Sequence, residues 1–485
     1  MRPFAGGAGR SHAALEPPTH WPRRPDPLLA GGAAFATAMG ATLAAGGAAG
    51  GVLPLGIVGA ALAATGLAVL LAAGWVEALA LVVLSVPLPS LISSGEMRLA
   101  AAAPVAALVV ASWALHVGAS GRRIDGGALP GAPFAVLLGA FALAAPFATS
   151  PLDAAREALN FAVLLALLVA AVDLVSAGRE RSEGVVTVLA AVAAVTGALA
   201  ALETVGVIPG EFPRWGTSYQ RAALGFGQPN PLALFLALSV PLLIHRRGVA
   251  ASRLARVAWS AGLGCAVLGL VGTFSRGAWA ALLIGAGALA TVRGWRSVVK
   301  VWGSALVIAL AIDVLSGGAL RDTLARTAGD WVLEQRALLL WAGVLMFLDH
   351  PLLGVGPGGF ATELDRYAPL LPRLWDLKPT PHNAYVQMAA ETGVVGLVAL
   401  VLFLVAFFRV FRRGVLEAEE DHERSLRGAL LWSFGIFVVA GLALWPFSHG
   451  IGEAVILILA LGAARAGRKG LGGDEDAARA ARGSR

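Results

Sequence analysis

The chain of 485 residues is 57% hydrophobic and 14% charged, with a mean hydropathy of +0.75. Soluble globular domains carry roughly 25% charged residues, so this composition excludes a soluble protein and indicates a polytopic membrane protein. A net charge of +7 would suggest a nucleic-acid partner for a soluble protein. In a membrane protein it is better explained by orientation in the bilayer, and we expect no nucleic acid as a partner.

Apolar segments of the length that crosses a bilayer, roughly 20 residues, follow one another along the chain. We count about fourteen (a range of about 12 to 14) from their length and hydropathy. They begin near residues 28, 52, 75, 99, 129, 155, 184, 229, 256, 277, 298, 383, 428 and 451. The predicted fold class is therefore all-α, a polytopic helical bundle. The expected organisation is a retained cytoplasmic leader at 1–27, N-terminal spans at 28–204, a catalytic membrane region at 205–466 and a cytoplasmic tail at 467–485.

Basic clusters occur in alternate loops, and the positive-inside rule places all of these loops in the cytoplasm. The clusters are Arg122–Arg123, Arg179–Arg181, His245–Arg256, Arg293–Lys300, Arg412–Arg427 and Arg465–Lys469. About fourteen spans are consistent with all of these loops on one side of the membrane, and we expect both termini in the cytoplasm.

The loops expected on the opposite side include two long ones, Val205–Asn230 and Ser316–His382. Long loops of this kind are usually lids or binding segments. Within the second, Arg336–Leu348 is too short and too flanked by charge for a span, and we interpret it as an interfacial or re-entrant helix. The glycine-rich Gly354–Phe360 follows it, and its spacing is wrong for a dinucleotide loop.

Outward arginines need an explanation under the positive-inside rule. They either extend to lipid phosphates or bind an anion, and a guanidinium fork suits a pyrophosphate. We favour anion binding for Arg221 and Arg276, because glycine and small residues beside them let a bulky anion approach the backbone. Arg214 and Arg336 are further candidates for substrate binding.

His382 stands at the start of a long apolar run, in the segment HNAYVQMAAETGVVG. Thr380 is predicted to cap the helix with Pro381 in its first position, so His382 would lie in the first turn, where the helix dipole favours a neutral imidazole that accepts protons. Asn383, Gln387 and Glu391 recur every four residues and would line one stripe of the helix as substrate-binding residues. The alternatives are a capping or interfacial histidine and a carboxylate that only braces a neighbouring helix. The glycines Gly393 and Gly396 are expected to allow close helix contact.

We expect neither a metal nor a cofactor. No outer loop has histidine, cysteine or acidic residues at metal-ligand spacing, and the single Cys265 excludes a cysteine-built site. The outward carboxylates that precede Arg221 form no paired acidic motif; they are Glu96, Asp153, Glu157 and Glu211.

The histidine segment resembles the signature of the bacterial O-antigen ligase and polymerase superfamily. The stretches RAALGFGQPNPLALFLA, FSRGAWAALL and HPLLGVGPGGF resemble its other signature stretches in the same order, over roughly residues 200 to 460. The resemblance implies an inverting membrane glycosyltransferase of the type C-like, all-helical kind, working at the periplasmic face of the bacterial inner membrane. The donor would be an undecaprenyl pyrophosphate-linked glycan, and the acceptor lipid A–core or a growing glycan. Arg221 and Arg276 would hold the pyrophosphate, and His382 would activate or position the acceptor hydroxyl.

A transporter or lipid-linked oligosaccharide flippase is the main alternative, and a structural envelope protein is the third. Transporters often show repeated halves and broken helices at mid-membrane, and we find no internal repeat in the sequence. Ligase, polymerase and protein glycan transferase remain open, because the shape of the loops decides the acceptor.

Overall fold

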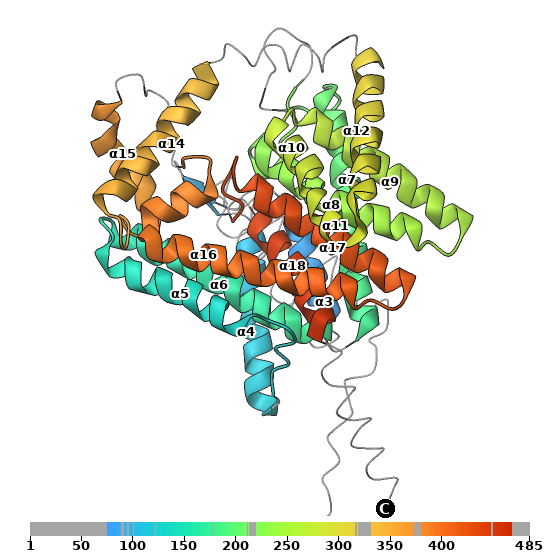
Figure 1. The fold of residues 1–485 in the computed structure, drawn as a ribbon, viewed down its shortest axis with the longest axis horizontal. Helices are drawn as coiled ribbons and strands as arrows, with labels where there is room; N and C mark the ends of the chain where they lie inside the picture. Colours follow the sequence, from blue (N-terminus) through green and yellow to red (C-terminus); the bar gives the residue numbers. More distant parts are fainter. Residues whose placement is uncertain are drawn as a thin grey trace, which may run out of the picture.

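A computed structural model describes residues 75–88, 92–94, 97–99, 101–121, 123–176, 178–210, 212, 220–315, 318, 331–371, 374, 380–447 and 450–467. Figure 1 shows a helical bundle, and the all-α prediction is confirmed. Five of the described helices are long and apolar enough to cross a membrane: Ala102–Ser120, Pro151–Ser176, Arg179–Thr204, Arg253–Gly272 and Ala384–Leu416. The chain is therefore a multi-pass membrane protein.

The helices in the first half of the described chain are α3 (Trp75–Ser85), α4 (Ala102–Ser120), α5 (Gly131–Ala144), η1 (Ala145–Phe147), α6 (Pro151–Ser176), α7 (Arg179–Thr204), η2 (Leu224–Phe226) and α8 (Pro229–Gly248). The second half holds α9 (Arg253–Gly272), α10 (Arg276–Gly285), α11 (Gly287–Arg293), α12 (Trp295–Leu315), α14 (Trp331–Asp349), α15 (Gly359–Tyr367), η3 (Ala368–Leu370), α16 (Ala384–Leu416), α17 (Asp421–Ala440) and α18 (Ile451–Gly467). Strands β1 (Ile92–Ser94) and β2 (Met97–Leu99) form a short antiparallel hairpin between α3 and α4.

Each apolar segment predicted beyond residue 74 overlaps a described helix, although α3, α10 and α11 are shorter than the predicted spans. The predicted spans that begin near residues 28 and 52, the leader and nearly all of the tail lie outside the described residues. The segment interpreted as interfacial or re-entrant belongs to α14, which is not among the five span candidates.

Small residues let the helices of the bundle approach one another closely. At the crossing of α7 and α9, a Cβ atom added to Gly197 would lie 2.5 Å from the Cα atom of Ala266, and one added to Gly269 would lie 2.5 Å from the Gly197 carbonyl oxygen. Gly285 of α10 and Gly435 of α17 make a second contact of this kind, with the added Cβ of Gly435 2.5 Å from the Gly285 carbonyl oxygen. Such contacts are typical of helix packing in bilayers, where van der Waals contact is a main source of attraction.

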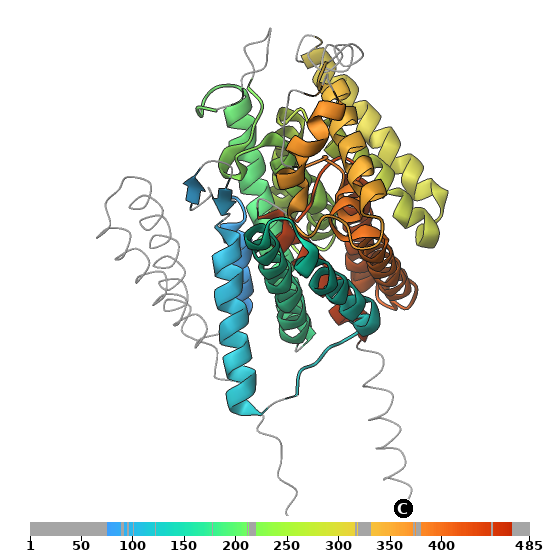
Figure 2. The same cartoon turned by 90° about the vertical axis from the view of Figure 1, so that its left-hand side faces the viewer.

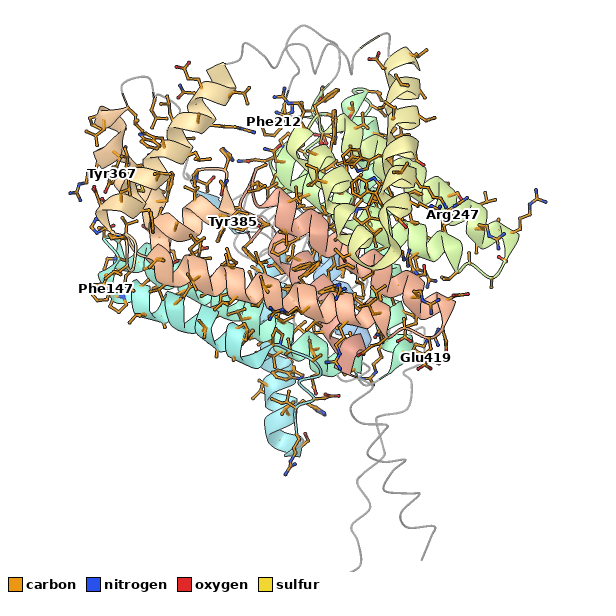
Figure 3. All side chains as sticks on the ribbon, in the orientation of Figure 1. Phe147, Phe212, Arg247, Tyr367, Tyr385 and Glu419 are labelled. Carbon is orange, nitrogen blue, oxygen red and sulfur yellow. The ribbon has the colours of Figure 1, made fainter. Side chains whose placement is uncertain are left out.

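The predicted cytoplasmic loops meet at one end of the bundle, as their alternation requires. Arg179 pairs with Glu420 across 2.8 Å, Arg246 pairs with Glu183 across 3.2 Å, and the Arg293 guanidinium donates to the backbone oxygen of Arg424. In Figure 3, Arg247 and Glu419 lie on the right-hand and lower side of the molecule, away from Tyr367 and Phe147 on the left. We call this region the inner end, and the opposite region, which includes Phe212 and Tyr367, the outer end.

A separate small core forms at the outer end from α14, α15 and the chain that follows them. We call residues 331–374, where described, the outer module. Its buried side chains are Leu339, Ala342, Met346, Val355, Phe360, Leu364, Tyr367, Leu371 and Leu374, and Ala390 of α16 completes the cluster. Figures 1 and 2 show α14 and α15 beside the outer part of α16. The long outer loop is therefore built on α16, close to His382.

Candidate active site

The segments that carry Arg221 and Arg276 dock directly on each other, although they are far apart in the sequence. The Arg221 guanidinium donates from Nε to the Thr273 backbone oxygen at 3.1 Å, and the Ala222 backbone N–H donates to the Gly272 oxygen at 3.0 Å. The Ser275 hydroxyl donates to Oδ1 of Asn230 at 2.9 Å. Ser275 precedes Arg276, which is the first residue of α10. The structure therefore brings the segments of both predicted catalytic arginines into one region.

Arg336 adds a third cation to this region from the outer module. Its side chain is half-buried in α14. Burial, followed by the positive charge of Arg276, lowers the pKa of the Arg336 guanidinium. A guanidinium stays charged at neutral pH even so, because its ordinary pKa lies far above neutral. The two cations therefore repel each other in the free protein, and an anion bound between them would relieve that repulsion.

His382 lies before α16 and not in its first turn, so the predicted cap at Thr380 is wrong. The helix begins at Ala384, and Asn383 is its N-cap: its side-chain oxygen accepts hydrogen bonds from the backbone N–H groups of Tyr385 and Val386, both at 3.0 Å. Asparagine caps a helix well because its oxygen satisfies N–H groups that have no partner within the helix. His382 is left as a partly exposed residue at the helix entrance, in the left-handed backbone region with φ of +54°.

The turn Gly441–Ala443, which follows α17, links the segment that follows His382 to the segment of Arg276. The Ala384 backbone N–H donates to the Gly441 oxygen at 2.7 Å, and the Asn383 amide donates to the Leu442 oxygen at 3.2 Å. On the other side, a Cβ atom added to Gly277, the neighbour of Arg276, would lie 2.9 Å from the Ala443 Cβ. One short turn thus touches the residues next to both predicted catalytic groups.

Backbone conformation marks the same three segments. In the part of the chain that the structure describes, the non-glycine residues with positive φ are Leu224 at +44°, Phe274 at +50° and His382 at +54°. Leu224 follows Arg221 by three positions, Phe274 precedes Arg276 by two, and the third is the histidine itself. Such conformations cost free energy for residues with a side chain and persist where the surroundings impose them, often at functional sites.

Glu391 binds the glycine-rich loop of the outer module. Its carboxylate accepts the Gly358 N–H at 3.0 Å and the Phe360 N–H at 3.4 Å, at the N-terminus of α15, where an anion is favoured. The Gln387 amide donates to the same carboxylate at 3.2 Å. The predicted polar stripe therefore exists, and its three members contact the protein: Asn383 caps the helix, while Gln387 and Glu391 fasten the outer module.

Gly393 and Gly396, which follow Glu391, do not contact a neighbouring helix of the described chain as predicted. Helix α16 breaks at Gly393, whose φ of +64° and ψ of −161° are not helical. A Cβ atom added there would lie 2.2 Å from the carbonyl of Leu352, so Gly393 admits the backbone of a loop and not a neighbouring helix. A Cβ added to Gly396 would meet Thr392 of its own helix. The expectation of close helix contact at these two glycines is wrong.

Glu203 is a residue of the site that the sequence analysis missed. It is buried near the end of α7, and its carboxylate accepts the backbone N–H groups of Ala223 at 3.1 Å and Leu224 at 3.0 Å. It therefore positions the segment that carries Arg221. A lone carboxylate inside an apolar span was the available signal, since such groups rarely lack a function.

The remaining predicted residues lie beside the outer module or outside the described residues, and Glu157 lies close enough to Glu391 to act on its charge. Arg214, Glu96 and Glu211 lie outside the described residues. The Asp153 carboxylate accepts the Ser150 hydroxyl at 2.6 Å and lies 3.4 Å from Thr362 of the outer module. Among the described residues, one group has the composition and spacing to hold a metal ion, Glu183 with His245 and His422, and it lies at the inner end.

Comparison with known proteins gives one family match. The model of the O-antigen ligase family matches residues 261–401, a region that includes Arg276, Arg336 and His382. The match confirms the resemblance to the O-antigen ligase and polymerase superfamily. Arg221 and Glu203 lie before the matched region. No curated protein matches the chain.

Proposed function

We propose that the protein transfers a glycan from a lipid-linked pyrophosphate, of the undecaprenyl type, to a sugar hydroxyl at the periplasmic face of the bacterial inner membrane. The observation that supports the proposal is the contact between the segments that carry Arg221, Arg276 and His382. These segments meet through the hydrogen bonds to Gly272 and Thr273 and through the turn Gly441–Ala443. The O-antigen ligase match supports the reaction class.

The proposed step is a single displacement at the anomeric carbon of the donor. The acceptor oxygen attacks from the face opposite the pyrophosphate, a new C–O bond forms, and the bond from the anomeric carbon to the phosphate oxygen breaks with inversion. His382 takes the hydroxyl proton as general base. The electron pair of the broken bond leaves with the pyrophosphate, so negative charge grows on the phosphate oxygens.

Guanidinium groups stabilise that charge. Arg276 and Arg336 have no carboxylate partner among the described residues, and the two cations already act on each other. A guanidinium placed where charge develops contributes most in the transition state, and it forms paired hydrogen bonds with phosphate oxygens. We therefore propose that Arg221 and Arg276, with Arg336, replace a metal ion in this reaction, and that Asn383, Gln387, Glu391 and Glu203 keep the segments in place.

The decisive experiment is glycan transfer by the purified protein, with a lipid pyrophosphate-linked glycan and a sugar acceptor. His382→Ala should lower the transfer rate by about 100-fold or more, the usual size of general-base catalysis. Membrane insertion and the thermal unfolding midpoint should stay close to wild type, because His382 caps no helix in the structure. His350→Ala, an exposed histidine of the outer module, is the matched control. Transfer by His382→Ala at the wild-type rate would refute the general-base role.

The same assay separates transfer from transport. A flippase moves the lipid-linked glycan across vesicles without consuming it, whereas a transferase releases the lipid pyrophosphate in proportion to the product. Translocation of intact donor without transfer would contradict the proposal. The acceptor decides between ligase and polymerase: lipid A–core as the productive acceptor indicates a ligase, and a second lipid-linked repeat indicates a polymerase.

Reporter fusions test the proposed orientation. Fusions at Ser218 and Trp375 should report the periplasm, and fusions at Ala251 and Glu419 the cytoplasm. A cytoplasmic signal from the Trp375 fusion would place His382 in the wrong compartment and overturn the proposal.

A further inference from the structure

Three predicted cytoplasmic segments place metal-ligating side chains together at the inner end. Glu183 lies in the first turns of α7, His245 in the last turn of α8 and His422 in the first turn of α17. One ligand atom from each of the three lies within 4.8 Å of the other two. Nε2 of His245 is 3.8 Å from Oε2 of Glu183, and Nε2 of His422 is 3.8 Å from Oε1 of the same carboxylate.

Of the three side chains, His245 has the strongest reason to bind an ion, because one of its buried ring nitrogens has no hydrogen bond with a described residue. It is fully buried, and its Nδ1 atom lies 3.0 Å from the Ser425 hydroxyl. When Nδ1 carries the proton and donates to that hydroxyl, the lone pair of Nε2 faces Glu183. No described residue gives this Nε2 atom a hydrogen bond. A buried nitrogen lone pair without a donor is costly, and a bound cation would satisfy it.

We propose that Glu183, His245 and His422 bind a divalent transition-metal ion of the Zn²⁺ type. Two imidazoles and one carboxylate form a common zinc ligand set, with a fourth position for water. Ligand atoms at about 2.1 Å from a tetrahedral ion stand roughly 3.4 Å apart, so binding requires these atoms to approach one another by at most about 1.4 Å. The contact of His245 with Ser425 is the usual outer partner of a metal-bound histidine, because it fixes the tautomer and the direction of the ring.

Two arginines compete with the ion for its ligands. Their contacts with Glu183 and His422 must change when the ion binds. Arg246 lies 3.2 Å from Oε2 of Glu183, and the Arg179 guanidinium donates to Nδ1 of His422 at 2.8 Å. For metal binding through Nε2, His422 must move its proton to Nδ1, and Arg179 must release that atom. Arg179 already pairs with Glu420 at 2.8 Å, so it keeps a partner after the release. Metal binding and the Arg179–His422 bond are therefore alternatives.

The ion would fasten the inner ends of α7, α8 and α17. A ligand that binds only the folded state stabilises that state in proportion to its concentration and affinity. The site lies at the opposite end of the bundle from the proposed transfer chemistry and takes no part in it.

The test is direct metal binding by the purified full-length protein in detergent, after removal of bound metal with a chelator. Titration with Zn²⁺ alone should show one ion per chain and a rise in the thermal unfolding midpoint. Co²⁺ as a substitute should give the visible absorption of a tetrahedral site. Glu183→Gln and His422→Gln should each weaken Zn²⁺ binding by about tenfold or more, since each removes one of three ligands. Arg179→Gln should strengthen binding, because it removes the competitor for Nδ1.

His116→Gln, an exposed histidine on α4, is the matched control and should leave binding unchanged. Because His422 is partly exposed, its variant is expected to fold even where a change at buried His245 does not. Equal Zn²⁺ binding by wild type, Glu183→Gln and His422→Gln would overturn the site, and so would the absence of tetrahedral Co²⁺ bands. Transfer activity is not the readout, so the outcome is separate from the proposed function. Transfer assays in excess chelator should include His422→Gln, which is expected not to bind this ion. A loss of transfer that follows removal of the ion from this site can then be distinguished from a metal requirement of the transfer reaction.

Discussion

The ion-paired arginines of the inner end differ from the arginines of the proposed site, although two other outer arginines also pair with carboxylates, Arg156 with Asp153 and Arg366 with Glu363. At the inner end, four arginines pair with carboxylates across 2.6 to 3.2 Å: Arg179 with Glu420, Arg246 with Glu183, Arg413 with Glu417 and Arg427 with Glu423. At the outer end, Arg276 and Arg336 pair with no carboxylate of the described chain, and Arg221 donates to a backbone carbonyl.

This difference separates structural cations from cations held for a ligand. An arginine with a carboxylate partner adds little net attraction for a further anion, because its charge is already balanced. Arg276 and Arg336, which have no such partner among the described residues, carry an unbalanced positive field that a pyrophosphate would neutralise. The left-handed residues Leu224, Phe274 and His382 occur at the outer end and hold the segments of these arginines. The charges of Arg276 and Arg336 and the strained backbone of these three segments therefore favour the same region as the site of transfer.

The largest expected effect comes from removing one outer cation. Arg276→Ala should lower the rate of glycan transfer by about 100- to 1,000-fold, the usual cost of losing one group that stabilises charge in the transition state. Arg413→Ala at the inner end is the control: its side chain is 77% exposed, and its pair with Glu417 contributes little. Initial rates at saturating acceptor measure both. Equal losses in the two variants would remove the functional distinction between the ends.

A second test breaks the attachment of the outer module. A Cβ atom at Gly354 would lie 2.3 Å from the Glu391 backbone carbonyl carbon, and φ at this glycine is +67°. Gly354→Ala should therefore cost about 3 kcal/mol of unfolding free energy, through overlap and backbone strain together.

Gly303→Ala in α12 is the matched control, because a Cβ there has open space. It should leave stability unchanged or raise it by up to about 1 kcal/mol, since alanine favours a helix over glycine. Thermal unfolding in detergent and protease sensitivity of residues 331–371 measure the two variants. A Gly354→Ala protein as stable as wild type would show that the loop is not held against α16 as described.

A smaller loss of transfer is expected when the planar guanidinium is replaced by an ammonium of the same charge. Arg221→Lys and Arg276→Lys keep the charge and lose the planar fork, so transfer should fall by about tenfold in each. Arg413→Lys should be neutral. Lysine variants with full activity, beside inactive alanine variants, would mean that the site needs charge alone.

The smallest effect concerns the outer module's own stability. The Tyr367 hydroxyl donates to Asp349 at 2.8 Å. Burial, and then this hydrogen bond, raise the pKa of Tyr367 from 10 to about 12. Between these values the unfolded chain loses the proton while the folded protein keeps it, so stability should fall as pH rises from 10 towards 12. Tyr367→Phe should cost about 1 kcal/mol at pH 7 and should abolish that alkaline decline. Unfolding midpoints between pH 7 and 12 measure both, and an unchanged decline in Tyr367→Phe would assign it to other groups.

Hydropathy predicted the helices well, because lipid leaves the backbone few alternatives to an α-helix. The alternation of basic clusters likewise predicted that the loops of Arg179, His245 and Arg427 share one end. Local sequence did not predict where α16 begins. Thr380 and Asn383 are both good caps, and the contact of the Asn383 amide with Leu442, distant in sequence, favours Asn383.

The sequence also did not predict the hydrogen-bond partners of the Glu391 side chain. The spacing of Asn383, Gln387 and Glu391 predicted a shared face, and the hydrogen bonds confirm that Gln387 and Glu391 are neighbours. The partners of that face, the Gly358 and Phe360 N–H groups, lie about thirty residues earlier, in a loop with no periodicity. Glu203 was missed for a similar reason, since its partners follow in a loop. The transfer roles of Arg221, Arg276 and His382 stay predictions until the assays above are made.

The break at Gly393 divides α16 into a short first part and a long second part. The part from Val394 to Leu416 is roughly 35 Å long at about 1.5 Å per residue, which suffices for a hydrocarbon layer of about 30 Å. The part from Ala384 to Thr392 folds back beside this span, because Ala384 and Tyr385 line one small cavity together with Leu400 and Leu404. In the proposed reaction, the acceptor hydroxyl therefore meets His382 beside the span and not above it, so the span itself forms one wall of the approach for the sugar.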